Sequence, residues 1–112
     1  MRRSLVAGNW KMNGSRKSAL ELATAIGAVV FEKTDVVVAP PTLHLDAVSS
    51  ALSSADVLLA GQDCSEHEKG AYTGENSALM LREIGCSHVI VGHSERRQLF
   101  GETDKRVALK VV

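Results

Sequence analysis

The sequence predicts an α/β fold built on a parallel sheet. Four short apolar runs recur along the 112 residues, at 5–7, 36–39, 57–60 and 89–91, and small or polar residues and then a helical stretch follow each run. These runs do not alternate polar and apolar residues, which is typical of strands that are buried on both faces. The segments between the runs are long enough for the crossover helices that parallel strands require.

Helical periodicity is clearest in the first connecting segment, between residues 15 and 31. Either Ser15 or Ser18 can cap this helix, because Ser18 and Glu21 have the spacing of a capping box. One face of the helix is expected to point inward and carries the apolar residues Ala19, Leu22, Ala23, Ile26, Val29 and Val30.

The later connections have their own start and stop signals. Thr42 is expected to cap a short helix that buries a stripe made of Leu45, Val48 and Leu52. Ser77 is expected to cap a third helix, which presents Leu81 and Ile84 inward and stops at Gly85. Ser94 is expected to cap a fourth helix, which Gly101 breaks.

The last helical stretch restarts at Thr103-Asp104, and its apolar side comprises Val107, Ala108 and Val111. Its pattern runs to Val112 without a glycine or a cap. Four β–α units cannot close an eight-stranded barrel, which usually needs about 250 residues. We therefore expect a single domain over residues 1–112, either half of a (β/α)8 barrel or a complete four-stranded open sheet, and the abrupt ending favours the half barrel.

Composition argues against two classes of partner. Lys and Arg total 13, as do Asp and Glu, so the formal net charge is zero and nothing suggests nucleic acid or an anionic membrane. No segment approaches the roughly 18–20 apolar residues of a membrane span, and the N-terminus lacks the apolar stretch of a signal peptide. The late basic cluster is interleaved with acidic residues and is expected to be a solvated, salt-bridged surface; it contains Arg96, Arg97, Lys105, Arg106 and Lys110.

The two cysteines, Cys64 and Cys86, fit neither a zinc ribbon nor a redox pair. Buried, reduced thiols in a cytoplasmic protein are the simplest interpretation, and no metal site is expected.

Polar residues that can do chemistry follow the predicted strands. Asn9 and Lys11 follow the first run, Gln62 and Asp63 the third, and His93 the fourth. Ligands of parallel α/β folds bind at the carboxyl ends of the strands, so groups from the first and fourth strands are expected to meet in one site. His93 precedes a helix, where the helix dipole disfavours positive charge, and a neutral imidazole there can donate a hydrogen bond to a substrate oxygen.

Each of these residues also has a purely structural interpretation. Lys11 taken alone reads as an ordinary exposed lysine, His93 as a structural histidine, and Glu95 as a first-turn acid favoured by the helix dipole. The remaining histidines, His44, His67 and His88, belong to no motif.

Motifs at four places decide between these interpretations. They are Asn9-Trp10-Lys11-Met12-Asn13-Gly14, Ala39-Pro40-Pro41, Gly70-Ala71-Tyr72-Thr73-Gly74-Glu75 and Gly92-His93-Ser94-Glu95-Arg96-Arg97. In this order and spacing they resemble the triosephosphate isomerase family closely, from one end of the chain to the other. The resemblance implies the first four β–α units of that family's barrel. It also implies a phosphorylated triose as substrate, interconverted between dihydroxyacetone phosphate and glyceraldehyde 3-phosphate in glycolysis and gluconeogenesis without a cofactor.

The resemblance also implies residue roles. Asn9 and Lys11 are expected to bind substrate, with Lys11 facing the phosphate, and His93 to be the neutral electrophile that stabilises the enediolate. This family is itself the standard example of that neutral imidazole. Glu95 is expected to pair with Lys11, and Ser94 to help position the catalytic glutamate.

The loop over residues 63–75 resembles the family's projecting loop, which docks into a partner subunit and places Thr73 near the partner's Asn9 and Lys11; Tyr72 and Glu75 belong to the same loop. The family's glutamate base lies on the sixth strand and its lid follows it, so both fall outside the four units found here. Without the base no proton moves between the two carbons.

Two interpretations therefore remain. The first is the N-terminal half of an isomerase, inactive unless the missing half completes it. Its expected partner is the missing C-terminal half or another copy of itself in a homo-oligomer. The second is a non-catalytic half barrel that binds phosphate weakly or pairs with itself. A flavodoxin-like domain fits poorly, because the first loop lacks a glycine-rich phosphate site.

Overall fold

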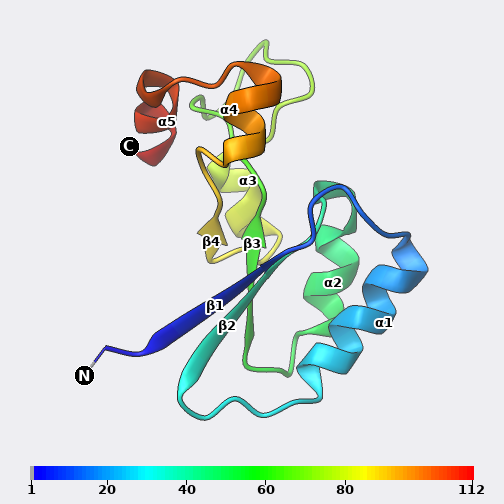
Figure 1. Ribbon diagram of the computed structural model, residues 1–112. Helices are drawn as coiled ribbons and strands as arrows, with labels where there is room; N and C mark the ends of the chain where they lie inside the picture. The colour runs from blue at the N-terminus through cyan, green and yellow to red at the C-terminus, as the bar shows by residue number, and fades with distance from the viewer. Residues whose placement is uncertain (1) are drawn as a thin grey trace.

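The computed structural model describes residues 2–112 and confirms the parallel α/β prediction. Four strands, β1 (Ser4–Asn9), β2 (Thr34–Ala39), β3 (Val57–Gly61) and β4 (His88–Val89), lie in the order β1-β2-β3-β4, and every neighbouring pair is parallel. Five α-helices and a 3-10 turn connect or follow them (Figure 1): α1 (Arg16–Gly27), η1 (Thr42–His44), α2 (Leu45–Ala51), α3 (Ala78–Glu83), α4 (Ser94–Phe100) and α5 (Asp104–Val111). This is the half barrel expected for four β–α units. Within residues 2–112, no helix is long and apolar enough to span a bilayer.

The sheet carries a different apolar cluster on each face, because side chains alternate along a strand. The larger cluster joins Val38 and Leu59 to the helices, through Ala23 of α1, Val48 of α2 and Leu81 of α3. The smaller cluster lies on the opposite, inner face and comprises Val37, Ala39 and Ala60, with Ile90 packed against them. In a closed barrel this inner face would be the interior.

The two central strands are more buried than the edge strands, although Leu58 of β3 is 37% exposed. Along β1, Leu5 and Val6 are 53% and 58% exposed, and Val89 of β4 is 36% exposed. Both strands are edges of the four-stranded sheet and have no strand beyond them among the described residues. The expectation of strands covered on both faces is therefore wrong for β1 and β4, because burial depends on neighbours that these 112 residues do not supply.

Two predicted caps are confirmed. Of the two candidates for α1, Ser15 is the cap: its hydroxyl accepts from the Ser18 N–H, and the Ser18 hydroxyl accepts from the Ser15 N–H, so the capping box is Ser15–Ser18 rather than Ser18–Glu21. The second confirmed cap is Ser77, whose hydroxyl accepts from the N–H of Met80. Thr103, where the last helix was expected only to restart, also caps it: its hydroxyl accepts from the N–H of Arg106. Because a short polar side chain satisfies its own helix N-terminus, the sequence alone can reveal such caps.

Other boundaries differ from expectation. Thr42 is the first residue of η1 rather than a cap, and His44 lies at the N-cap of α2. The cap of α4 is His93, so Ser94 is the first helical residue and the expected Ser94 cap is wrong. The fourth strand is His88–Val89 rather than 89–91, although the Ile90 N–H still donates to the Gly61 carbonyl at 2.8 Å.

Two apolar faces are less buried than their periodicity predicts. On α1 and the segment after it, Leu22, Val29 and Val30 are exposed while Ala19 and Ala23 are buried. On α5, no residue is fully buried, and Val111 is 70% exposed. Periodicity identifies an apolar face, but packing requires a partner element on that side.

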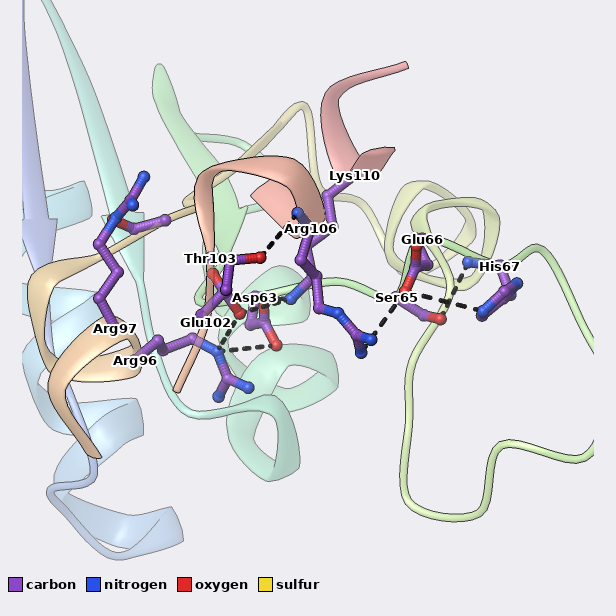
Figure 2. A network of polar contacts seen from close by, with 11 residues as sticks. Asp63, Ser65, Glu66, His67, Arg96, Arg97, Glu102, Thr103, Arg106 and Lys110 are labelled. Atoms are coloured by element: carbon purple, nitrogen blue, oxygen red, sulfur yellow. Dashed lines mark hydrogen bonds and ion pairs between the residues drawn. The ribbon is translucent and has the colours of Figure 1, made fainter. Parts of the chain in front are cut away.

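A buried ion cluster attaches α5 to the rest of the chain instead (Figure 2). The Lys110 ammonium lies 2.8 Å from Asp63 and 2.8 Å from Glu102, and the side chains of Lys110 and Glu102 are only 3% and 2% exposed. Arg96 contacts the same two carboxylates at 3.2 and 3.1 Å. The expected solvated surface is thus wrong for Lys110 and Glu102, because sequence patterning cannot tell an exposed ion pair from an enclosed one.

Candidate active site

The loop after β1 presents Lys11 in a strained conformation. Lys11 is the only non-glycine residue among the described ones with a positive φ, at 56°. A left-handed backbone is costly for a residue with a side chain and persists only where the surroundings impose it. Here the Lys11 N–H donates to Asn9 Oδ1 at 2.9 Å, and the Lys11 carbonyl accepts from Gln62 Nε2 at 2.7 Å. Both ends of the residue are therefore held by side chains from the carboxyl ends of β1 and β3.

Gln62 and His44 are the residues that the motif analysis missed. Gln62 Nε2 also donates to the Ala39 carbonyl at 2.9 Å, so one amide joins the ends of β2 and β3 to the Lys11 loop. The His44 ring nitrogen lies 3.1 Å from the Gly14 carbonyl and ties the far end of the same loop to η1. The only sequence signal for Gln62 was its position directly after a buried strand, and His44 had none.

The Lys11 ammonium lies 2.6 Å from the Glu95 carboxylate, which joins the β1 loop to α4. In a flat sheet the first and fourth strands would be about 14 Å apart, three strand spacings. Their carboxyl ends approach because the sheet curls, as a barrel requires. The hydrogen bond from Lys11 holds the pKa of Glu95 below its ordinary value, and the positive charge of Lys11 acts in the same direction.

His93 is positioned by its own helix. Its Nδ1 accepts the Glu95 N–H at 3.0 Å, so the imidazole itself serves as the cap of α4. A ring nitrogen that accepts a hydrogen bond carries no proton, so the neutral ring has its proton on Nε2. Nε2 is then a hydrogen-bond donor, and this is the form that can donate to a substrate oxygen.

The remaining predicted site residues lie nearby but differ in surroundings. Asn9 ends β1 half-buried, with its side-chain oxygen engaged by Lys11. Ser94 is exposed at the first position of α4. The structure thus joins the Asn9 side chain to the Lys11 backbone and the Lys11 side chain to Glu95, with His93 at the start of α4.

The projecting loop is ordered by its own contacts. His67 and Tyr72 stack with ring centroids 3.9 Å apart and planes inclined by 3°. The Ser65 N–H donates to the Asn76 carbonyl at 2.9 Å across the base of the loop, and the Glu75 N–H donates to Tyr72 at 3.0 Å. Residues 67–75 are all exposed, including Thr73. His67, which belongs to no motif, therefore has a clear packing role.

The family model described as triosephosphate isomerase matches residues 4–112. The chain belongs to the triosephosphate isomerase family. The chain is 52% identical over 112 residues to the triosephosphate isomerase of Coxiella burnetii (strain Dugway 5J108-111), with 98% of this chain and 44% of the relative covered.

Two further relatives are also triosephosphate isomerases of similar identity to this chain. The triosephosphate isomerase of Thermoanaerobacter sp. (strain X514) is 50% identical over 113 residues, covering 100% of this chain and 46% of the relative. The triosephosphate isomerase of Hydrogenovibrio crunogenus is 47% identical over 114 residues, covering 99% of this chain and 45% of the relative. The chain thus spans a little under half the length of the triosephosphate isomerases it matches.

Proposed function

We propose that this chain supplies one half of a triosephosphate isomerase site: the electrophile and the cation, but not the base. In this proposal residues 1–112 form one domain, the N-terminal half of the barrel. Lys11, Asn9 and His93 act on a phosphorylated triose in the cytoplasm, where Cys64 and Cys86 stay reduced. The conversion is that of dihydroxyacetone phosphate and glyceraldehyde 3-phosphate, in glycolysis and gluconeogenesis, with no cofactor or metal.

The observation that carries this proposal is the joint geometry of Lys11 and His93. Glu95 contacts both: its carboxylate pairs with the Lys11 ammonium, and its N–H occupies His93 Nδ1. One residue thereby orients a full positive charge and a neutral Nε2–H donor at the same end of the sheet. That pairing suits a substrate with a phosphate at one end and a carbonyl near the other.

Each group then has a defined task. The Lys11 ammonium attracts the phosphate and offsets negative charge on the substrate oxygens. The Nε2–H of His93 donates to the oxygen on which negative charge develops as a proton leaves the adjacent carbon. That proton must go to a base, and the family's glutamate base lies beyond the fourth β–α unit. The chain by itself therefore orients the substrate but cannot move the proton.

We further propose that the complete protein is a homodimer in which the projecting loop enters a second copy. An apolar groove of about 380 Å³ lies beside the Lys11 loop, lined by Trp10, Asn13, Gly14, Ser18, Ala19 and Leu22. The loop tip at Tyr72 and Thr73 is exposed and is stiffened by the His67–Tyr72 stack, so it loses little conformational freedom on docking. Thr73 of one copy then lies near Asn9 and Lys11 of the other.

The test is an assay of glyceraldehyde 3-phosphate conversion with three proteins: the 112-residue chain alone, the chain mixed with the remaining part of the Coxiella burnetii enzyme, and a chimera that joins the two. We expect no turnover from the chain alone, some from the mixture, and high turnover from the chimera. Lys11→Met should abolish turnover in the chimera with its circular dichroism unchanged, whereas Lys17→Met, an exposed lysine of α1, should not.

Full activity of the chain alone, or near-normal activity of the Lys11→Met chimera, would refute these assignments. A second candidate function, a non-catalytic half barrel that pairs with itself, is favoured by the exposed Leu5 and Val6 at the β1 edge. An inactive chimera together with a stable, monodisperse dimer of the chain would support that alternative.

A further inference from the structure

Arg97 folds back over the start of its own helix. Its Nε donates to the carbonyl of Gly92 at 2.9 Å, and Gly92 is the residue directly before His93. Its backbone N–H donates to the carbonyl of His93 at 3.2 Å. One residue therefore binds the peptide groups on both sides of the His93 α-carbon.

The arginine is itself anchored. Its Nη1 lies 2.5 Å from Asp104 Oδ1 at the first turn of α5. Figure 2 shows Arg96 and Arg97 pointing in different directions: Arg96 enters the cluster of Asp63 and Glu102, whereas Arg97 points away from it. The two consecutive arginines thus have separate partners.

The turn that Arg97 binds is a constrained one. Gly92 has φ +67°, and a Cβ added there would lie 3.0 Å from Val107 Cγ1 and 3.1 Å from Arg97 Nη2. The chain leaves β4 through this left-handed residue, so the orientation of the Gly92 peptide sets the direction in which His93 begins α4. A freer Gly92 carbonyl would let the imidazole rotate and lose the Nδ1 contact with Glu95.

We propose that Arg97 is a positioning residue, which holds Gly92 so that the imidazole of His93 keeps its Nε2–H aimed into the site. The catalytic meaning of this inference rests on the proposed function, whereas the geometric claim does not. Arg97 does not touch substrate, and its guanidinium acts through the Gly92 carbonyl alone.

The geometric claim is tested on the 112-residue chain by NMR of the His93 ring. In the native chain the two ring nitrogens should give separate signals, with protonated Nε2 and bare Nδ1. Arg97→Gln should move these two signals toward each other, because the ring then samples both tautomers. Lys105→Gln, which removes an exposed cation next to Asp104, should leave them unchanged. Asp104→Ala removes only the anchor, and should give a smaller change in the same direction.

The Asp104 side chain is 95% exposed, so Asp104→Ala should leave the fold intact. This variant therefore tests the positioning role of Arg97 even if Arg97→Gln does not fold. Unchanged ring signals in the folded Arg97→Gln chain would overturn the proposal. If that variant is unfolded, unchanged signals in Asp104→Ala would overturn it equally.

The catalytic consequence is measured in the chimera. Arg97→Gln should lower kcat at least about tenfold and change KM less than about twofold, because a misdirected electrophile weakens the transition state more than substrate binding. Arg97→Lys, which keeps the charge but loses the directed Nε–H, should recover only part of kcat. A chimera inactive with every native residue in place would count against the proposed function alone, since the ring signals would still report on Arg97.

Discussion

Replacing Lys110 by Met tests whether the buried ion cluster holds α5. The Lys110 side chain is 3% exposed, and its ammonium contacts Asp63 and Glu102, both at 2.8 Å. Removing one partner of a buried pair costs about 3–5 kcal/mol, because the remaining charge is left uncompensated. Arg96 still contacts both carboxylates after the change, at 3.2 and 3.1 Å, so the lower limit of about 3 kcal/mol applies.

The loss should be local to α5. This helix has no fully buried residue, and its links to the rest of the chain are the Lys110 pairs, the more exposed pairs of Asp104 and Arg106, and the contact of Val107 with Gly92. A decrease of about 3 kcal/mol in the free energy of local opening corresponds to about 100-fold faster amide exchange. Hydrogen exchange followed by mass spectrometry should therefore show this acceleration across residues 104–111, with the amides of β2 and β3 unchanged.

The control is Lys105→Met, which removes the same charge from an exposed position on the same helix and should alter exchange less than about threefold. Equal acceleration in β2 and α5 would show that the cluster supports the whole fold rather than one helix. Acceleration below about threefold in Lys110→Met would refute the idea that these ion pairs hold α5 at all.

Three further outcomes follow from the same structure. Burial alone would raise the pKa of Glu102, but hydrogen bonds from Lys110 and Arg96 outweigh it and leave the pKa below its ordinary value. This stabilisation is present above the unfolded pKa, about 4.3, and disappears only at lower pH, so helical circular dichroism that falls between pH 5 and 7 would contradict it. Deleting residues 66–71 from the chimera should shift its sizing profile from dimer toward monomer. An unchanged elution position would argue against docking of the projecting loop into a second copy. The isolated chain should self-associate through its exposed β1 and β4 edges, as a concentration-dependent sedimentation profile would show; a monomer at all concentrations would exclude this.

Local chemistry explains which parts of the fold could be predicted. The caps at Ser15, Ser77 and Thr103 depend on one hydroxyl and the helix it precedes, so a few residues of sequence contain the whole interaction. The four strands and their order along the chain follow from apolar runs and crossover lengths in the same way. The motif around His93 indicated the site because helix N-termini and strand ends impose their geometry locally.

The wrong predictions have two different origins. Ser94 was expected to cap α4, but the imidazole of His93 takes that position, because its Nδ1 reaches the Glu95 N–H once the Gly92 turn is set. The α5 stripe has the pattern of an inward face, yet Ala108 and Val111 are exposed, because only Val107 of the stripe packs against the rest of the described residues, near Gly92. The exposure of α5 depends on what lies across space, whereas the His93 cap is a contact between near neighbours in which an imidazole replaces the expected hydroxyl.

By itself, the sequence of this protein determined the class of fold, the family resemblance and the residues that can carry the chemistry. Only the tertiary structure decided how those residues are held: the left-handed Lys11 between Asn9 and Gln62, the burial of Lys110 against Glu102, and the contact of Lys11 with Glu95 across a curled sheet. The physical reason is distance along the chain. Periodicity and caps are interactions between near neighbours, whereas burial, strain and ion pairing are decided by residues that folding brings together from distant positions.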